Sequence, residues 1–150
     1  FSFIKKNCNN KIPKNFNMNE IDKKLLNNLQ NYIPNLTNLM NKQNLNEYIK
    51  IVINFSFDSN KYFNDLEPWA VKKKDPERMN VIIYTIIQQI KNISILLSPI
   101  IPDTAKKVLN TMNIQDDQIS IKNITNYNLF DHDKELKDHE ILFKKIENDN

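Results

Sequence analysis

Apolar residues recur every three or four positions along most of the chain, which is the spacing of one helix face. The pattern predicts a helix around residues 21–29, capped by Asn19 or Asp22, and another that starts at Pro34. A long helix should follow over about residues 44–65. Its inward-facing stripe is expected to consist of Leu45, Tyr48, Val52, Phe55, Ser59 and Tyr62.

A second long helix is predicted between two groups of prolines. Residues 75–77 (Asp-Pro-Glu) combine a capping carboxylate, a proline in the first turn and an acid near the positive end of the helix dipole. The helix should run to about residue 98, where Pro99 and Pro102 end it, and a short helix should follow over 103–109. Its single apolar face is expected to contain Met79, Ile82, Ile83, Ile86, Ile87, Ile90, Ile93 and Leu97.

The two ends of the chain carry weaker patterns. Residues 1–8 are typical of the last turns of a helix, and residues 9–18 of a loop. We therefore predict one all-α domain over 1–150: an antiparallel helical bundle over 1–112, and an irregular C-terminal tail over 113–150 that packs back on it and can end in a short strand. The expected anchors of the tail are Leu129, Phe130, Leu142, Phe143 and Ile146.

Composition excludes several classes of site. The chain has 26 Asn, 22 Ile and 20 Lys, which is typical of an AT-rich genome, and it has no Gly. Without Gly there is no Gly-rich phosphate loop and no dinucleotide-binding fingerprint. Left-handed helix ends must then use other residues, and Asn41, Asn110 and Asn113 are the candidates.

Charge and cysteine content indicate the kind of partner and the cell compartment. Residues 1–74 carry 12 Lys and 6 acidic residues, whereas residues 75–150 carry 9 basic and 12 acidic residues, so one half suits a polyanion. Cys8 is the only cysteine, which excludes an internal disulfide and favours a reducing compartment. No apolar run approaches the ~20 residues of a membrane helix, and no signal-peptide pattern is present, so no membrane partner is expected.

No set of residues has the spacing of a catalytic centre. His132 and His139 lie in an acidic segment and could share a helix face near a metal, but such a run is more often a solvated surface. We predict no catalytic residue, no metal and no cofactor in this chain.

The most specific chemistry lies in residues 59–78. The only tryptophan, Trp69, follows Pro68 where a helix should end, and Lys72, Lys73 and Lys74 come next. Single-stranded RNA is usually bound in this way, with unpaired bases stacked on an aromatic ring and phosphates contacted by cations. Two interpretations stay open: Trp69 is a stacking platform, or it caps the bundle core while the lysines serve solubility.

The same segment resembles a known family. Asn60, Tyr62 and the Pro68-Trp69 pair form an N-x-Y-x5-P-W pattern similar to that of the anticodon-binding domain of methionyl-tRNA synthetases. Lys74-Asp75 and Arg78 also fit. Further similar segments, in the same order as in the family, are residues 1–13, 97–105 and 141–147.

The resemblance implies a C-terminal domain that reads the CAU anticodon of methionine tRNAs. Trp69 would stack on an anticodon base, Pro68 would fix its approach, and Asn60 would lie beside the site and organise the helix end. We add Lys72, Lys73 and Lys74 as expected phosphate contacts. In the family two further readers, an Asn and an Arg, precede the position that matches Phe1.

The resemblance also implies a separate catalytic domain, which would use ATP to join methionine to tRNA in the cytoplasm or an organellar matrix. Two alternatives remain. The class I synthetases for valine, isoleucine, leucine and cysteine share the helical architecture, although the Pro-Trp pair favours methionine. In a different class, the chain would be a protein-interaction or structural domain with Trp69 buried.

Overall fold

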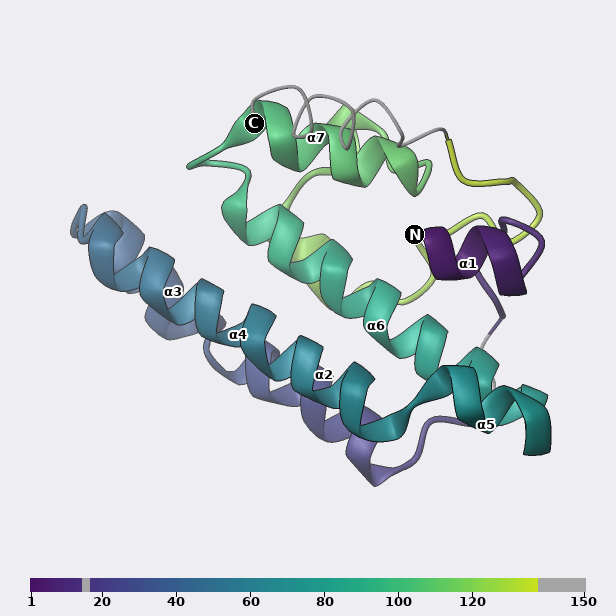
Figure 1. Cartoon of the computed structure of the whole chain (residues 1–150). Coiled ribbons are helices and arrows are strands. Elements are labelled where there is room, and N and C mark those ends of the chain that lie inside the picture. The colour runs from purple at the N-terminus through teal and green to yellow at the C-terminus, as the bar shows by residue number, and fades with distance from the viewer. Residues whose placement is uncertain (15–16, 138–150) are drawn as a thin grey trace, which may run out of the picture.

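The computed structural model describes residues 1–14 and 17–137, and all regular structure in them is helical (Figure 1). The predicted all-α fold is confirmed. An isolated antiparallel bridge joins Lys11 to Glu135. The α-helices are α1 (Ser2–Asn7), α2 (Glu20–Asn31), α3 (Ile33–Asn41), α4 (Leu45–Leu66), α5 (Pro68–Lys74), α6 (Pro76–Leu97) and α7 (Pro102–Thr111), and the short 3-10 helices are η1 (Asp116–Gln118) and η2 (Ile121–Ile124).

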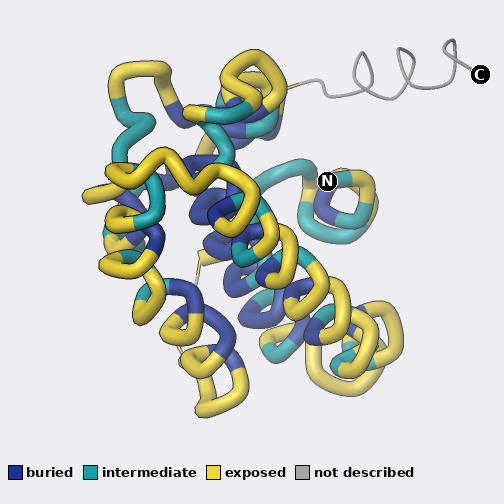
Figure 2. The backbone as a smooth tube through the Cα atoms, turned by 90° about the vertical axis from the view of Figure 1, so that its left-hand side faces the viewer, coloured by how far each residue is buried: buried dark blue, intermediate teal, exposed yellow. Residues whose placement is uncertain are grey.

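Helix α6 is the centre of the fold, with α2, α4, α5, α7 and η2 packed around it. Figure 2 shows its backbone mostly as buried, whereas the outer helices are exposed on their outward sides. By length and composition α6 would also pass for a membrane span, but 78% of its most apolar stretch is buried inside the fold, as in any core helix.

The apolar face predicted for α6 is confirmed as mainly buried, but the polar side of the helix is buried as well. Its polar residues Gln88, Lys91 and Asn92 are fully buried, whereas Ile86 and Ile90 of the predicted stripe are only half-buried. The cause is the segment after α7, which covers the polar side of α6. Lys91 donates to the carbonyl of Asn126 at 2.8 Å, and Gln88 donates to the carbonyl of Tyr127 at 3.2 Å.

The segment after α7 lacks regular structure apart from η1 and η2, yet it contributes to the core. Ile114, Ile124, Phe130 and Leu136 are buried, and Leu129 is half-buried against the same cluster. Within the described residues the core therefore continues beyond α7. The other expected anchors (Leu142, Phe143 and Ile146) and the short strand lie outside the described residues.

The inward stripe of α4 is confirmed except at its first position. Tyr48, Val52, Phe55, Ser59 and Tyr62 are buried, but Leu45 is 42% exposed because it occupies the first turn, at the end of the bundle. At α2 the cap is Asn19, whose side chain accepts from the N–H groups of Ile21 and Asp22. Asp22 instead completes a capping box from inside the helix.

Left-handed backbone occurs at Asn9, Asn10, Gln43, Glu67 and Asn113 among the described residues. Asn113 was correctly predicted, but Asn41 and Asn110 lie inside α3 and α7. Helix α7 runs to Thr111, further than predicted, and the left-handed residue that follows each C-cap is Gln43 after α3 and Asn113 after α7.

Asp22 is a buried acid that joins three helices. Its carboxylate accepts two hydrogen bonds from the guanidinium of Arg78 in α6, at 2.6 and 2.9 Å, and one from the hydroxyl of Tyr62 in α4 at 2.5 Å. The backbone N–H of Asn19 donates to it at 2.9 Å. Burial by itself would raise the pKa of Asp22, but these hydrogen bonds and the charge of Arg78 hold the pKa below its ordinary value.

Asp22→Asn should therefore destabilise the fold by ~2–4 kcal/mol at neutral pH, because it removes the carboxylate that pairs with the Arg78 guanidinium. The folded-state pKa of Asp22 is depressed, so its contribution is present above about pH 4 and is lost as the pH falls through the folded-state pKa. Urea denaturation at neutral and at acidic pH measures this. The exposed Asp58→Asn is the control, and an equal cost of Asp22→Asn at both pH values would contradict the assignment.

Lys91 should also make stability depend on pH, but here burial itself causes the shift in pKa. Burial lowers its pKa to about 7, and its ammonium lies between the rings of Tyr127 and Phe130, at 5.8 and 5.9 Å. At this side chain the unfolded chain therefore binds more protons than the fold between pH 7 and 10.5, so the contribution of Lys91 to stability should rise with pH in this window, by about 1.4 kcal/mol per pKa unit. Lys91→Met should flatten that rise in urea denaturation. Parallel curves for the two proteins would show that Lys91 is not desolvated.

Candidate functional site

The joint between α4 and α5 sets the position of Trp69. Helix α4 ends at Leu66, and Glu67 adopts left-handed backbone angles (φ 47°, ψ 62°). This single residue changes the direction of the chain, and Pro68 then opens α5 at a position where its fixed φ suits a helix. The sequence predicted that a helix ends before Pro68, which is confirmed, but it did not predict that Pro68 also starts the next helix.

Trp69 is neither enclosed in the core nor fully open. Its side chain is 46% exposed, and its ring packs against Phe63 of α4 with 5.9 Å between the ring centroids. Phe63 in turn contacts Phe3 of α1 edge to face, at 5.8 Å. The indole is therefore supported from behind by aromatic rings, while about half of its surface is accessible to a ligand.

Trp69 lies in a groove between α5 and α1. The groove has a volume of about 640 Å³ and is lined by Ser2, Phe3, Lys6, Asn7, Trp69, Lys72 and Lys73. All of its charged lining residues are lysines, and no acidic residue of the described chain is among them. Lys72 donates to the side-chain oxygen of Asn7 at 2.6 Å, so the two walls of the groove are in direct contact. An aromatic face beside uncompensated cations suits an unpaired base and its phosphates.

A family model described as the anticodon-binding domain of methionyl tRNA ligase matches residues 12–150. The chain belongs to this family.

Individual relatives agree with that assignment. The chain is 30% identical over 111 residues to the methionine–tRNA ligase of Rickettsia felis, which covers 74% of the chain and 22% of the relative. It is 31% identical over 117 residues to that of Rhizobium meliloti, covering 78% and 23%. The chain thus spans less than a quarter of the length of these two relatives.

The fold is also shared with a solved structure. The free-state methionyl-tRNA synthetase of Mycobacterium tuberculosis superposes with a TM-score of 0.83 at 20% identity, covering 91% of this chain and 28% of that one. At that identity the likeness concerns the helical architecture, and it supports the all-α prediction.

Of the other residues expected at the site, two lie in the groove with Trp69 and the others lie outside it. Lys72 and Lys73 line the groove with Trp69, because residues three and four positions apart share a helix face. Lys74 is exposed but is not among the lining residues. Pro68 is buried beneath the joint. Asn60 is exposed on α4 and lines a neighbouring apolar hollow, which it shares with Phe1, Phe3 and Phe63 among others.

Sequence reasoning missed the contribution of α1. Lys6 and Asn7 form the second wall of the groove, more than 60 positions before Trp69 in the chain. No local pattern links the two segments. The only signal was the family resemblance of residues 1–13, which identified the segment without giving it a role.

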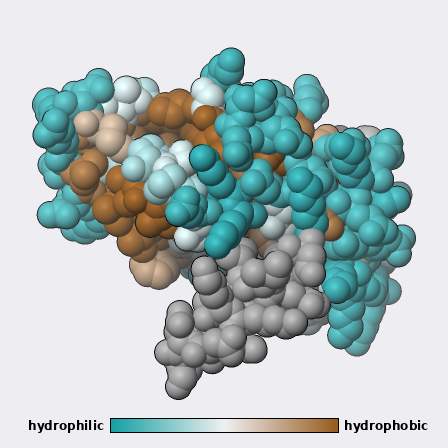
Figure 3. All heavy atoms as spheres, turned by 90° about the horizontal axis from the view of Figure 1, so that it is seen from above, coloured by the Kyte–Doolittle hydropathy of each residue, from teal (hydrophilic) through white to brown (hydrophobic). Residues whose placement is uncertain are grey.

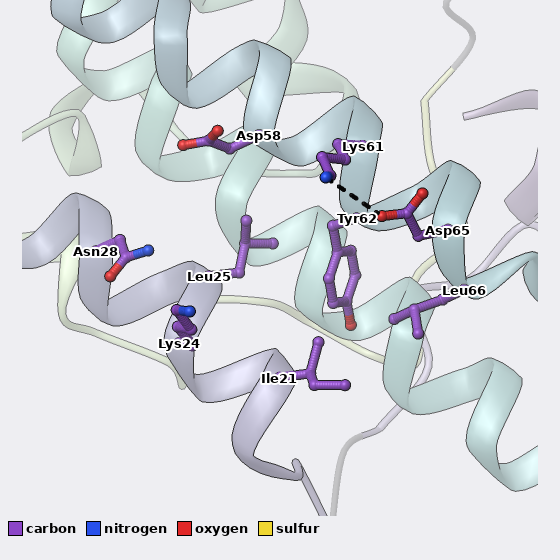
Figure 4. A pocket seen from close by; sticks show the side chains of 9 residues that line it. All are labelled: Ile21, Lys24, Leu25, Asn28, Asp58, Lys61, Tyr62, Asp65 and Leu66. Carbon is purple, nitrogen blue, oxygen red and sulfur yellow. Dashed lines mark ion pairs between the residues drawn. The ribbon is translucent and has the colours of Figure 1, made fainter.

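Apolar exposure alone does not distinguish this site. Figure 3 shows a hydrophobic area on one face of the molecule. Among individual side chains, Phe57 and Ile53 of α4 are 63% and 42% exposed. A second hollow of about 310 Å³ lies between α2 and α4, with Ile21, Leu25 and Tyr62 facing into it (Figure 4). The charged residues around that hollow are of both signs: Lys24, Lys61, Asp58 and Asp65, with Lys61 and Asp65 4.0 Å apart. The groove beside Trp69 differs from this hollow, because it combines an aromatic ring with charges of one sign.

Neither His132 nor the cysteine Cys8 is among the residues that line this groove. His132 contacts the carbonyl of Ile12 at 2.9 Å and its ring stacks near Tyr84, while His139 lies outside the described residues. Burial raises the pKa of the Cys8 thiol, and the nearby charge of Lys72 opposes this only partly. The thiol is therefore held in its less reactive, protonated form.

The accessibility of Trp69 can be measured directly, because it is the only tryptophan in the chain. With about half of the side chain exposed, acrylamide should quench its emission with a constant between those of a buried indole and of the unfolded chain. The unfolded chain in urea is the reference. Emission as shielded as that of a core indole would mean that the ring is closed to ligands.

Proposed function

We propose that this chain binds the anticodon loop of a tRNA in the groove between α1 and α5. Trp69 stacks on an unpaired anticodon base, and Lys72 and Lys73 contact the adjoining phosphates. The observation that carries the proposal is the position of a half-exposed tryptophan in a groove whose charged lining residues are all lysines. Unpaired RNA bases are recognised by stacking, which is worth ~1–3 kcal/mol per base.

Family membership supports the choice of tRNA, and the resemblance of the N-x-Y-x5-P-W segment supports the CAU anticodon. The relatives are named methionine–tRNA ligases, and each is several times longer than this chain. We infer that the chain serves as the RNA-reading part of such a ligase, whose ATP-dependent reaction belongs to a separate catalytic domain. The relatives reported above are bacterial, which supports a cytoplasmic setting.

Titration of the chain with two anticodon stem-loops tests this proposal. One stem-loop carries CAU and the other a changed first anticodon base, and Trp69 emission is the signal. We expect quenching by the CAU stem-loop at lower concentrations. Equal quenching by both would limit the function to unspecific loop binding, and no quenching by either would favour a structural or protein-interaction domain.

Substitution of the platform gives the matched test. Trp69→Ala should weaken binding of a labelled CAU stem-loop by ~1–3 kcal/mol, as expected for the loss of one stacked base, with little change in melting temperature. Phe57→Ala, which removes a more exposed aromatic ring outside the groove, is the control and should bind normally. Equal affinity of the two variants would contradict stacking on Trp69.

A further inference from the structure

Tertiary contacts hold helix α1 against the rest of the fold. It has six residues, and Ile4 anchors it in the core at 2% exposure. Phe3 packs on Phe63, the ring that also supports Trp69. These contacts place Ser2, Phe3, Lys6 and Asn7 on the side of α1 that faces α5. The helix is thus fixed to the same aromatic cluster as the proposed stacking platform.

The side chain of Asn7 is oriented at both ends of its amide. Its nitrogen donates to the carbonyl of Phe3 at 3.0 Å, and its oxygen accepts from the ammonium of Lys72 at 2.6 Å. Asn7 is uncharged, so this hydrogen bond directs Lys72 without neutralising it. Lys61 of α4 differs, because it lies 4.0 Å from the carboxylate of Asp65.

Three positive charges therefore converge on the groove without an acidic lining residue: Lys6 from α1, and Lys72 and Lys73 from α5. Like charges held close together repel each other, and an anion between them relieves the repulsion. An extended RNA strand with a base on Trp69 carries phosphates on both sides of that base. A strand in the groove would thus meet lysines on both walls.

Resting on the function proposed above, we propose that α1 is the second wall of the RNA site: Lys6 contacts a backbone phosphate across the groove from Lys73, and Asn7 is a positioning residue that holds Lys72 toward the strand with its charge intact. Lysines of two helices then contact the RNA backbone, whereas the sequence pattern predicted phosphate contacts only from the lysines that follow Trp69.

Salt dependence counts the phosphate contacts. The logarithm of the binding constant falls with the logarithm of salt concentration by ~0.7 per phosphate neutralised on a single strand. Lys6→Gln should reduce this slope for the CAU stem-loop by about that amount. Lys50→Gln is the control, because Lys50 is exposed on α4 and does not line the groove, and its slope should stay close to that of the unmodified chain.

Two variants of Asn7 test whether this residue positions Lys72 or only stabilises the fold. Asn7→Asp keeps an acceptor for Lys72 but neutralises its charge, so the slope should fall by roughly 0.7. Asn7→Ala frees Lys72 with its charge intact, so affinity should fall while the slope changes less. Melting temperatures of both variants show whether α1 stays in place. A slope that falls more for Ala than for Asp would overturn the role of Asn7.

The outcome for Lys6 is distinguishable from failure of the proposed function. If Trp69→Ala weakens binding but Lys6→Gln has the slope of Lys50→Gln, the RNA site stands and the second wall is wrong. If Lys6→Gln weakens binding of a fully paired RNA duplex of equal length just as much, Lys6 belongs to a general polyanion surface, and the proposal is overturned. A slope change confined to the stem-loop supports it.

Discussion

The carboxylate of Asp22 joins the parts of the fold from which the candidate site projects. It is the one fully buried acid among the described residues, and it links its own helix α2 to α4 and α6. Tyr62 lies one turn before the end of α4, and Arg78 lies in the first turn of α6. The end of α4 and the start of α6 are therefore held against the start of α2. Because α5 connects those two points, the Asp22 cluster fixes where α5 can lie.

This constraint explains how a seven-residue helix can present an aromatic ring. Alone, α5 would not be stable, since most helical stability in proteins comes from packing. Pro68 is buried at the joint, and Val71 packs against the cluster of Leu25, Tyr62 and Ile82. With Pro68 and Val71 directed inward, Trp69, Lys72 and Lys73 are left for the groove. The buried side of α5 thus determines which of its residues a ligand can reach.

Prediction from sequence succeeded where the signal was local. The spacing of Tyr48, Val52 and Phe55 placed α4, and the Pro68-Trp69 pair with its lysines marked the segment of the groove. It failed where a partner lies far along the chain. The burial of Gln88 and Lys91 depends on carbonyls of residues 126 and 127, which no periodicity reveals. The second wall of the groove depends in the same way on the packing of Phe3 against Phe63.

The distribution of cations completes this picture. The chain has a single arginine, and it is used inside the fold, where its planar fork makes two hydrogen bonds to Asp22. The groove is left with lysines, which act as compact point charges on flexible stems and do not read base edges in a fixed geometry. Contacts to phosphates position a nucleic acid, whereas contacts to bases specify it. Under the proposed function, the lysines of α1 and α5 therefore set the register of the strand, and within the described residues discrimination between anticodons falls to the surface around Trp69.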